Sequence, residues 1–311
     1  MRYVSLDMVR GFAVLAMLFV NILTFLSADL PLILQHNLEM MMPGDLVAPL
    51  FQFILGISLV ISVDRRKARD EKVWKHVLKR AVSLIVLGFI LTSSLMGFQE
   101  IRWGVLQSLG VGLLLGYLFL PLPVVFRATA AGLVLLSYSL LFVFVPGFSD
   151  FIMEGTHGGP VGAISYGMVT VFGTIAGEWL YRKKERLRQG VLVGFGLILL
   201  SLIISIVISF NRQTVSASYM LFSAGLSFLL ISMFYCIGEW KKKDVKPLSL
   251  MGRNALSLWI ALYVFYLPFI YILGGCCFMP AYIGLAATIL ILPLFYVLAD
   301  ILEWKKIRLT I

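Results

Sequence analysis

Apolar runs of about 20 residues recur from one end of the chain to the other, and each is long enough to cross a membrane as an α-helix. Short polar and basic segments separate the runs, so no stretch remains for a soluble domain. A water-soluble globule with 60% hydrophobic and 14% charged residues would lack the polar side chains to cover its surface. The pattern therefore predicts an all-α integral membrane protein.

We expect a single bundle of about ten transmembrane helices that forms one membrane domain over residues 1–311. No small-residue cleavage site follows the first apolar run, which we interpret as a retained helix. The spans are expected near residues 11–27, 45–63, 77–95, 103–120, 124–145, 164–181, 191–209, 216–237, 254–273 and 281–299.

The basic residues indicate the orientation of the bundle. Of the 26 Lys and Arg, all except Arg102 and Arg212 fall on one side of the expected spans. Because Lys and Arg are enriched in cytoplasmic loops, both termini are predicted to be cytoplasmic, with the helices in the plasma membrane. The net charge of +10 then needs no nucleic-acid partner. On the same side, Trp179, Trp240 and Trp304 close apolar runs and are predicted to anchor them at the lipid headgroups.

Cysteine usage argues against metal or redox chemistry. Cys236 lies within a span, whereas Cys276 and Cys277 are adjacent in an outer turn. These spacings match neither a disulfide framework nor a metal-binding motif, so no metal is expected.

Polar residues in the first span lie on one helical face. Arg10 and Asn21 are eleven residues apart, which places them about 20° apart in rotation and about 16 Å apart in rise. Intramembrane polar groups usually pair or face a wet cavity, so this face could connect the basic rim with the outer half of the membrane. In the simpler alternative, Asp7 pairs with Arg10 and Asn21 bonds a neighbouring helix.

Other cations lie where spans begin at the basic rim. Arg253 and Asn254 open the ninth span, and Lys79 and Arg80 lie at the start of the third. Such cations are candidates for binding phosphate, although extending to the lipid headgroups is their more common role.

The outer side carries the candidates for acid and base chemistry. Asp45 follows His36 by nine residues, so the two meet only if the segment between them folds back. The carboxylate would then orient the imidazole and raise its basicity; alternatively, Asp45 only caps the second helix. His157 is a weaker candidate of the same kind.

Polar groups also mark the outer start of the fourth span, where Glu100, Arg102 and Gln107 lie close together in the chain. Arg102 is one of the two basic residues on the outer side, where Lys and Arg are otherwise absent. Two interpretations stay open for it, the binding of an anionic ligand and an ion pair with Glu100.

Five segments, in this order, resemble the heparan-α-glucosaminide N-acetyltransferase family of membrane enzymes. They are SLDMVRGFAVLAMLFVN (5–21), His36 with GDLVAPLFQFILGISL (44–59), IRWGVLQSLGVG (101–112), FGTIAGEWL (172–180) and MGRNALSLWIALYVF (251–265). The resemblance spans almost the whole chain. It implies a transmembrane acetyltransferase that moves an acetyl group from cytosolic acetyl-CoA to an amino sugar or related glycan across the membrane.

The resemblance also implies roles for individual residues. His36 falls where the family has its catalytic histidine, and Asp45 matches the aspartate that follows it. Arg10, Asn21 and Asn254 match family positions. We therefore expect His36 to act as the base or to carry the acetyl group, with Asp45 orienting it.

The remaining candidates are assigned from the chemistry that the family's reaction requires. Residues expected to bind acetyl-CoA are Arg10, Asn21, Lys79, Arg80, Gln107, Arg253 and Asn254, and those expected to bind the acceptor are Glu100, Arg102 and His157. Lipids surround the bundle, and a homodimer stays open.

Two other functions stay open. A transporter or exporter of a small polar or lipid-linked substrate would also place polar residues along a path, but the sequence predicts no interrupted helix pair of the kind that transporters use. An O-acyltransferase of a cell-envelope glycan would use the same machinery on a hydroxyl acceptor.

Overall fold

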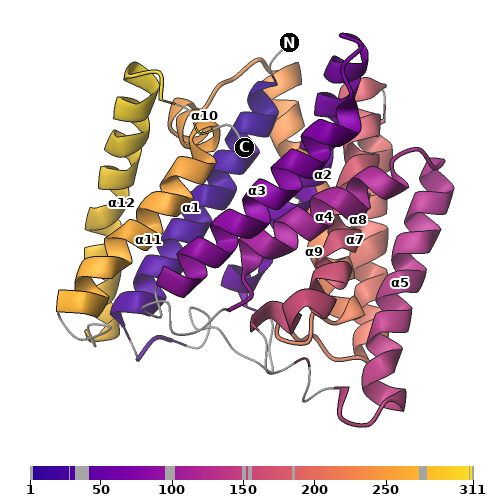
Figure 1. Ribbon diagram of the computed structural model, residues 1–311, viewed down its shortest axis with the longest axis horizontal. Coiled ribbons are helices and arrows are strands. Elements are labelled where there is room, and N and C mark those ends of the chain that lie inside the picture. The colour runs from indigo at the N-terminus through magenta and orange to yellow at the C-terminus, as the bar shows by residue number, and fades with distance from the viewer. Residues whose placement is uncertain are drawn as a thin grey trace. The chain divides into compact units, whose positions relative to one another are not determined.

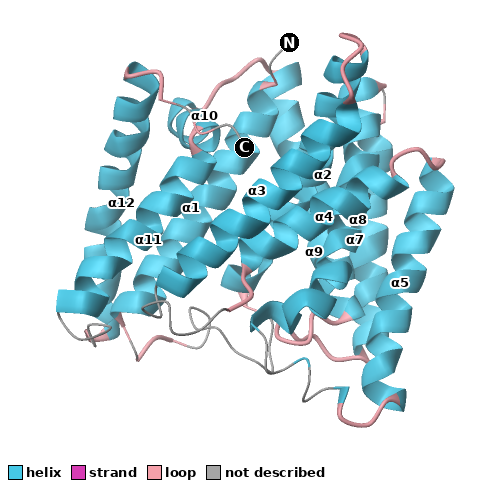
Figure 2. Ribbon diagram, in the orientation of Figure 1, coloured by secondary structure: helices cyan, strands magenta, loops and turns pink. Residues whose placement is uncertain are grey.

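The computed structural model describes residues 3–27, 29–31, 42–94, 102–148, 152, 156–183, 186–272, 279–307 and 309. These residues form helices joined by short connections, and Figure 2 shows no strand in the described part of the chain. One isolated bridge pairs Ser27 with Met279. The prediction of an all-α membrane protein is thus confirmed.

The described residues fall into two compact units. The first contains the described residues within 1–37, 42–47 and 233–310, and the second contains mainly the described residues within 48–232. The sequence predicts one membrane domain over residues 1–311. That the two units function together as this domain stays a prediction.

The helices of the first unit come from both ends of the chain (Figure 1). They are α1 (Val4–Leu26), η2 (Pro43–Leu46), η5 (Cys236–Trp240), α10 (Lys246–Arg253), α11 (Ala255–Ile272) and α12 (Ala281–Trp304), together with the end of α9 (Ala217–Tyr235). Contacts described below place the start of α1, all of α10 and the end of α12 at one basic end of this unit.

The second unit contains the helices between them. They are α2 (Val47–Lys67), α3 (Val73–Ser94), α4 (Val105–Phe119), α5 (Val124–Phe144), η3 (Thr156–Gly158), α7 (Gly159–Gly177), η4 (Glu178–Arg182), α8 (Leu187–Ser205) and most of α9. The apolar stretch of the span Gly159–Arg182, which contains α7, is 83% buried, whereas that of α8 is 17% buried. α7 is therefore a core helix and α8 a peripheral one. Glycines let α2 and α7 touch: a Cβ at Gly56 or Gly173 would collide with the backbone of the other helix.

Eight of the described helices are long and apolar enough to cross a membrane, or nine if α10 and α11 count as one bent span. α4 is apolar but has only 15 residues. All ten predicted segments coincide with a helix, counting α4 and α11. The expectation that the ninth helix opens at Arg253 and Asn254 was incomplete, because α10 precedes α11 and meets it at an angle of 78°.

The predicted role of Trp179 as an interfacial anchor was wrong. Its side chain is buried, and its ring lies 6.2 Å from that of Phe228 inside the second unit. Trp240 and Trp304 are 64% and 80% exposed, as side chains at the headgroup layer should be.

Candidate functional site

The polar face of α1 begins with an ion pair. Arg10 Nη1 lies 3.4 Å from Asp7 Oδ1, as the simpler interpretation of this helix predicted. Asn21 does not follow that interpretation: its Nδ2 donates to the carbonyl oxygen of Met17 in the same helix, at 2.9 Å. The ion pair fixes the guanidinium of Arg10 at the basic end of the first unit.

A close helix crossing brings α10 onto this start of α1. A Cβ at Gly11 would collide with the carbonyl of Leu248, and one at Gly252 would collide with the carbonyl of Asp7. Only glycine allows backbones to approach so closely. The preceding segment is tied down as well, since the Glu239 carboxylate accepts a 2.9 Å hydrogen bond from the hydroxyl of Ser5.

Arg253 and Asn254 lie at the corner between α10 and α11. Arg253 Nε is 3.1 Å from Glu303 Oε1, within ion-pair distance but without the alignment of a hydrogen bond. Asn254 is buried, and its Nδ2 donates to the carbonyls of Leu250 at 3.1 Å and Ala299 at 3.3 Å. Its Oδ1 has no hydrogen-bond partner among the described residues.

Because Gly252 touches the backbone of α1 at Asp7 and Gly11, the crossing brings the backbones at Arg10 and Arg253 close together at one basic end. Each arginine lies against a carboxylate, Asp7 or Glu303. A guanidinium in such a pair can exchange the carboxylate for a phosphate, which presents the same geometry to its N–H groups. Two guanidinium groups, each paired with one carboxylate, thus lie at this end of the first unit.

Asp45 is buried in η2, where its Oδ2 accepts a 3.0 Å hydrogen bond from the backbone N–H of Met42. Asp45 thus takes part in capping, but from the third residue of η2: the N-cap is Met42, and not Asp45 as the simpler interpretation expected. His36 lies outside the described residues, so its pairing with Asp45 stays a prediction.

Gln107 lies at the start of α4 in the second unit. Its Nε2 donates to the carbonyl of Arg102 at 3.2 Å and to the hydroxyl of Thr92 at 3.4 Å. Its buried Oε1 has no partner among the described residues. Glu100 lies outside those residues, which leaves its predicted pairing with Arg102 untested.

The other sequence candidates of the second unit lie on separate elements. His157 has a φ of 55°, in the left-handed region, and its Nδ1 is 3.3 Å from the hydroxyl of Tyr166. Lys79 is exposed and Arg80 half-buried near the start of α3. No group of three or more His, Cys, Asp or Glu among the described residues is placed to hold a metal ion.

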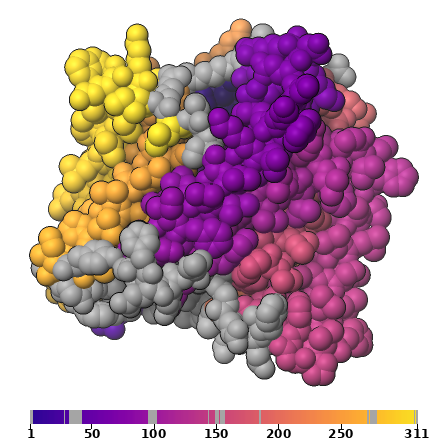
Figure 3. Space-filling model, in the orientation of Figure 1, coloured from indigo at the N-terminus to yellow at the C-terminus, as the bar shows by residue number. Residues whose placement is uncertain are grey.

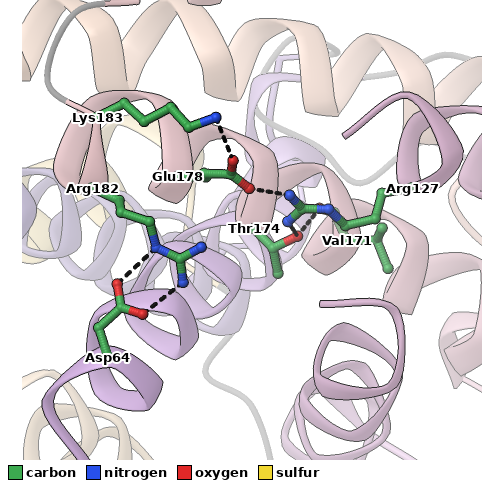
Figure 4. Close-up of polar contacts among 7 residues, drawn as sticks. All are labelled: Asp64, Arg127, Val171, Thr174, Glu178, Arg182 and Lys183. Carbon is green, nitrogen blue, oxygen red and sulfur yellow. Dashed lines mark hydrogen bonds and ion pairs between the residues drawn. The ribbon is translucent and has the colours of Figure 1, made fainter. Parts of the chain in front are cut away.

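An ionic network in the second unit was missed in the sequence (Figure 4). Arg127, 1% exposed, donates to Thr174 Oγ1 at 3.0 Å and pairs with the Glu178 carboxylate. Lys183 Nζ lies 3.0 Å from the other oxygen of Glu178. A lone cation at the start of an apolar helix is the signal that could have identified Arg127, because such a charge needs a partner.

Two further polar pairs of this unit carried no sequence prediction. Arg182 holds Asp64 through two parallel hydrogen bonds of 2.9 and 2.6 Å. The fully buried Thr170 donates to Gln52 Oε1 at 2.6 Å, and Gln52 Nε2 has no partner within the described residues. The buried Thr170–Gln52 pair joins α7 to α2 where lipid supplies no hydrogen bonds.

Comparison with known proteins gives two matches. Residues 2–191 match the family model described as "Heparan-alpha-glucosaminide N-acetyltransferase, catalytic". The chain is also similar to the "Uncharacterized 39.9 kDa protein in amylase 3'region" of Bacillus acidopullulyticus, with 26% identity over 159 residues. That match covers 42% of this chain and 45% of the relative, so the chain spans less than half the length of the curated relative.

Proposed function

From its membership of the heparan-alpha-glucosaminide N-acetyltransferase catalytic family, a family of transmembrane acetyltransferases, we propose what this chain does. It moves an acetyl group from cytosolic acetyl-CoA to the amine of an amino sugar or related glycan on the opposite side of the membrane. The plasma membrane is its proposed compartment, and a homodimer stays open.

The observation that carries the proposal is the crossing of α1 and α10 at Gly11 and Gly252. It brings the backbones at Arg10 and Arg253 close together, and the phosphates of acetyl-CoA need such cations at the basic rim. Arg10 pairs with Asp7 and Arg253 with Glu303. We propose that the phosphates replace these two carboxylates when acetyl-CoA binds. Lys79 and Arg80 are proposed for the same role on the sequence alone.

Asn21 and Asn254 of the first unit are proposed to line the path of the pantetheine arm, which carries two amide groups of its own. The Oδ1 of Asn254 is suited to accept one of its N–H groups, because the Nδ2 of the same side chain already donates to two carbonyls. The Nδ2 of Asn21 makes one such bond, so its second N–H is the donor that we assign to the developing oxyanion. Gln107, in the second unit, is proposed to bind acetyl-CoA on the sequence alone.

The chemical step is assigned to His36, with Asp45 orienting the imidazole. His36 either removes a proton from the acceptor amine or carries the acetyl group as an intermediate, and both routes require the same aspartate. Glu100, Arg102 and His157 are proposed to bind the acceptor on the outer side.

The test of the phosphate site is the binding of acetyl-CoA to the purified protein in detergent. Arg253→Gln and Arg10→Gln should each weaken binding by about tenfold or more, because each removes a charged hydrogen-bond donor. Arg188→Gln removes an exposed arginine of α8 and is the matched control, with wild-type affinity expected. Unchanged affinity in both variants would overturn the phosphate site.

The break between α10 and α11 bears on the transporter alternative. The expectation that no helix pair is interrupted was wrong, since the two meet at 78°. The break, however, separates a strongly amphipathic eight-residue helix at the basic end from a full-length apolar one. Transporters place broken helices at the membrane midplane, so this break fits an interfacial helix better.

The O-acyltransferase alternative is distinguished by its product. Hydroxylamine cleaves the ester that such an enzyme forms, whereas it leaves an N-acetyl group intact.

A further inference from the structure

An apolar groove lies between α11 and α12 in the first unit. Its volume is about 560 Å³, in the range of small-molecule sites. Its walls are apolar side chains such as Val264 and Leu294, and Ser257 is the polar residue among those that line it. Ile307 and Leu309, which follow α12, also line it. Figure 3 shows α11 in orange and α12 in yellow side by side on one face.

The length of the groove matches one leaflet of a bilayer. On α11 its lining runs from Ser257 to Phe265, which is about 12 Å of helix, and on α12 from Ile291 to Leu302, about 16 Å. Half of a hydrocarbon core of roughly 30 Å is about 15 Å. The groove therefore runs from the basic face to about the midplane, as one lipid acyl chain does.

The basic end of the groove is cationic. Lys305 and Lys306 follow directly after α12, and both are exposed. Trp304, 80% exposed, marks the headgroup level at the same turn. Because the carboxylate of Glu303 pairs with Arg253, the positive charges of the two lysines can interact with an anionic ligand. Ser257, the polar lining residue, is at this end as well.

We propose that this groove binds a single anionic glycerophospholipid of the leaflet at the basic face. One acyl chain fills the groove between α11 and α12, and the phosphate lies at Lys305 and Lys306. An acyl chain alone gives no preference for the headgroup, whereas two lysines at the mouth of the groove attract an anionic one.

The test compares retention of phosphatidylglycerol and of phosphatidylcholine with the same acyl chains, measured by native mass spectrometry of the intact protein. The wild type should retain one phosphatidylglycerol and prefer it about tenfold or more. Ala261→Phe fills the groove and should abolish retention. Ala286→Phe makes the same change at an exposed α12 position outside the groove and should leave retention intact.

The double variant Lys305→Gln/Lys306→Gln tests the headgroup separately, because both residues are exposed and lie beyond the helix. It should bind both lipids equally. Equal binding of the two lipids by the wild type, or full retention by Ala261→Phe, would overturn the proposal. If Ala261→Phe does not fold, the lysine variant decides: an unchanged preference for phosphatidylglycerol refutes the site.

Discussion

Asp45 accepts a backbone hydrogen bond and also carries a negative charge. Two substitutions distinguish the contribution of the hydrogen bond from that of the charge. Its carboxylate accepts the N–H of Met42 at 3.0 Å. Asp45→Asn keeps an acceptor for that bond, so its melting temperature should stay near that of the wild type. If the charge orients His36, kcat should still fall by about 10²-fold or more.

Asp45→Ala removes both functions and should lose turnover together with about 1 kcal/mol of stability. The comparison is made by thermal melting and acetyl transfer on the same preparations. Wild-type kcat in Asp45→Asn would reduce Asp45 to a cap and remove it from the catalytic site.

The two arginines drawn in Figure 4, Arg127 and Arg182, differ in burial, and their substitutions should differ in cost. Arg127 has 2% side-chain exposure, so Arg127→Met leaves Glu178 with Lys183 alone and should cost about 3 kcal/mol. Arg182 is 39% exposed and its partner Asp64 41%, so Arg182→Gln should cost less than about 1 kcal/mol. Thermal melting in detergent measures both, and equal losses would contradict the assigned roles.

Residues that pair within one helix turn could be predicted from the sequence, and distant partners could not. Asp7 and Arg10 are three residues apart, so their pairing follows from helical spacing alone. Arg127 finds Thr174 and Glu178, which are 47 and 51 residues away. Arg253 likewise pairs with Glu303 from the last helix. No local pattern encodes such contacts, because the packing of helices creates them.

At the scale of helices, the crossing of α1 and α10 depends on glycine. Gly252→Ala places a Cβ against the carbonyl of Asp7, so the helices must separate, at a cost of about 1–3 kcal/mol. The same variant should bind acetyl-CoA more weakly, since Arg253 moves with α10.

Gly196→Ala on α8 is the matched control, because a Cβ there meets nothing within 4 Å. It should raise stability by about 0.5–1 kcal/mol, as helical Gly→Ala changes do. Melting curves of the two variants should therefore shift in opposite directions. A shift of the same sign and size in both would mean that close contact at Gly252 is unimportant.

The predicted spans were accurate where a helix is long and apolar, because an uninterrupted run of lipid-soluble residues leaves few alternatives. α10 was missed for the opposite reason. Its eight residues, Lys246–Arg253, are polar enough to resemble a basic loop, and the helix is stabilised by its packing on α1. Trp179 was misassigned because sequence cannot tell a buried indole from an interfacial one.

At the scale of the whole molecule, the first and last long helices constrain the number of crossings between them. The start of α1 lies against Gly252, and Glu303, near the end of α12, lies beside Arg253, so the start of α1 and the end of α12 share one end of the first unit. We therefore expect an even number of crossings from α1 to α12. The described residues give nine candidate spans, with α10 and α11 counted as one, and ten if the short α4 also crosses, as the sequence predicts.

We expect that shared end to be cytoplasmic, because it carries the basic residues. A green fluorescent protein fused after the last residue should fluoresce in cells, and an alkaline phosphatase fused there should be inactive. An active phosphatase fusion would contradict this orientation and with it the cytosolic entry of acetyl-CoA.

The most direct test of the proposed acetyltransferase is turnover of acetyl-CoA by the purified protein with glucosamine as acceptor. The wild type should release free CoA and form N-acetylglucosamine. His36→Ala should bind acetyl-CoA but release none, whereas His76→Ala, the same change near the start of α3, should retain turnover. Well-folded wild-type protein that neither binds nor consumes saturating acetyl-CoA would contradict the account, and normal turnover by His36→Ala would remove its catalytic residue.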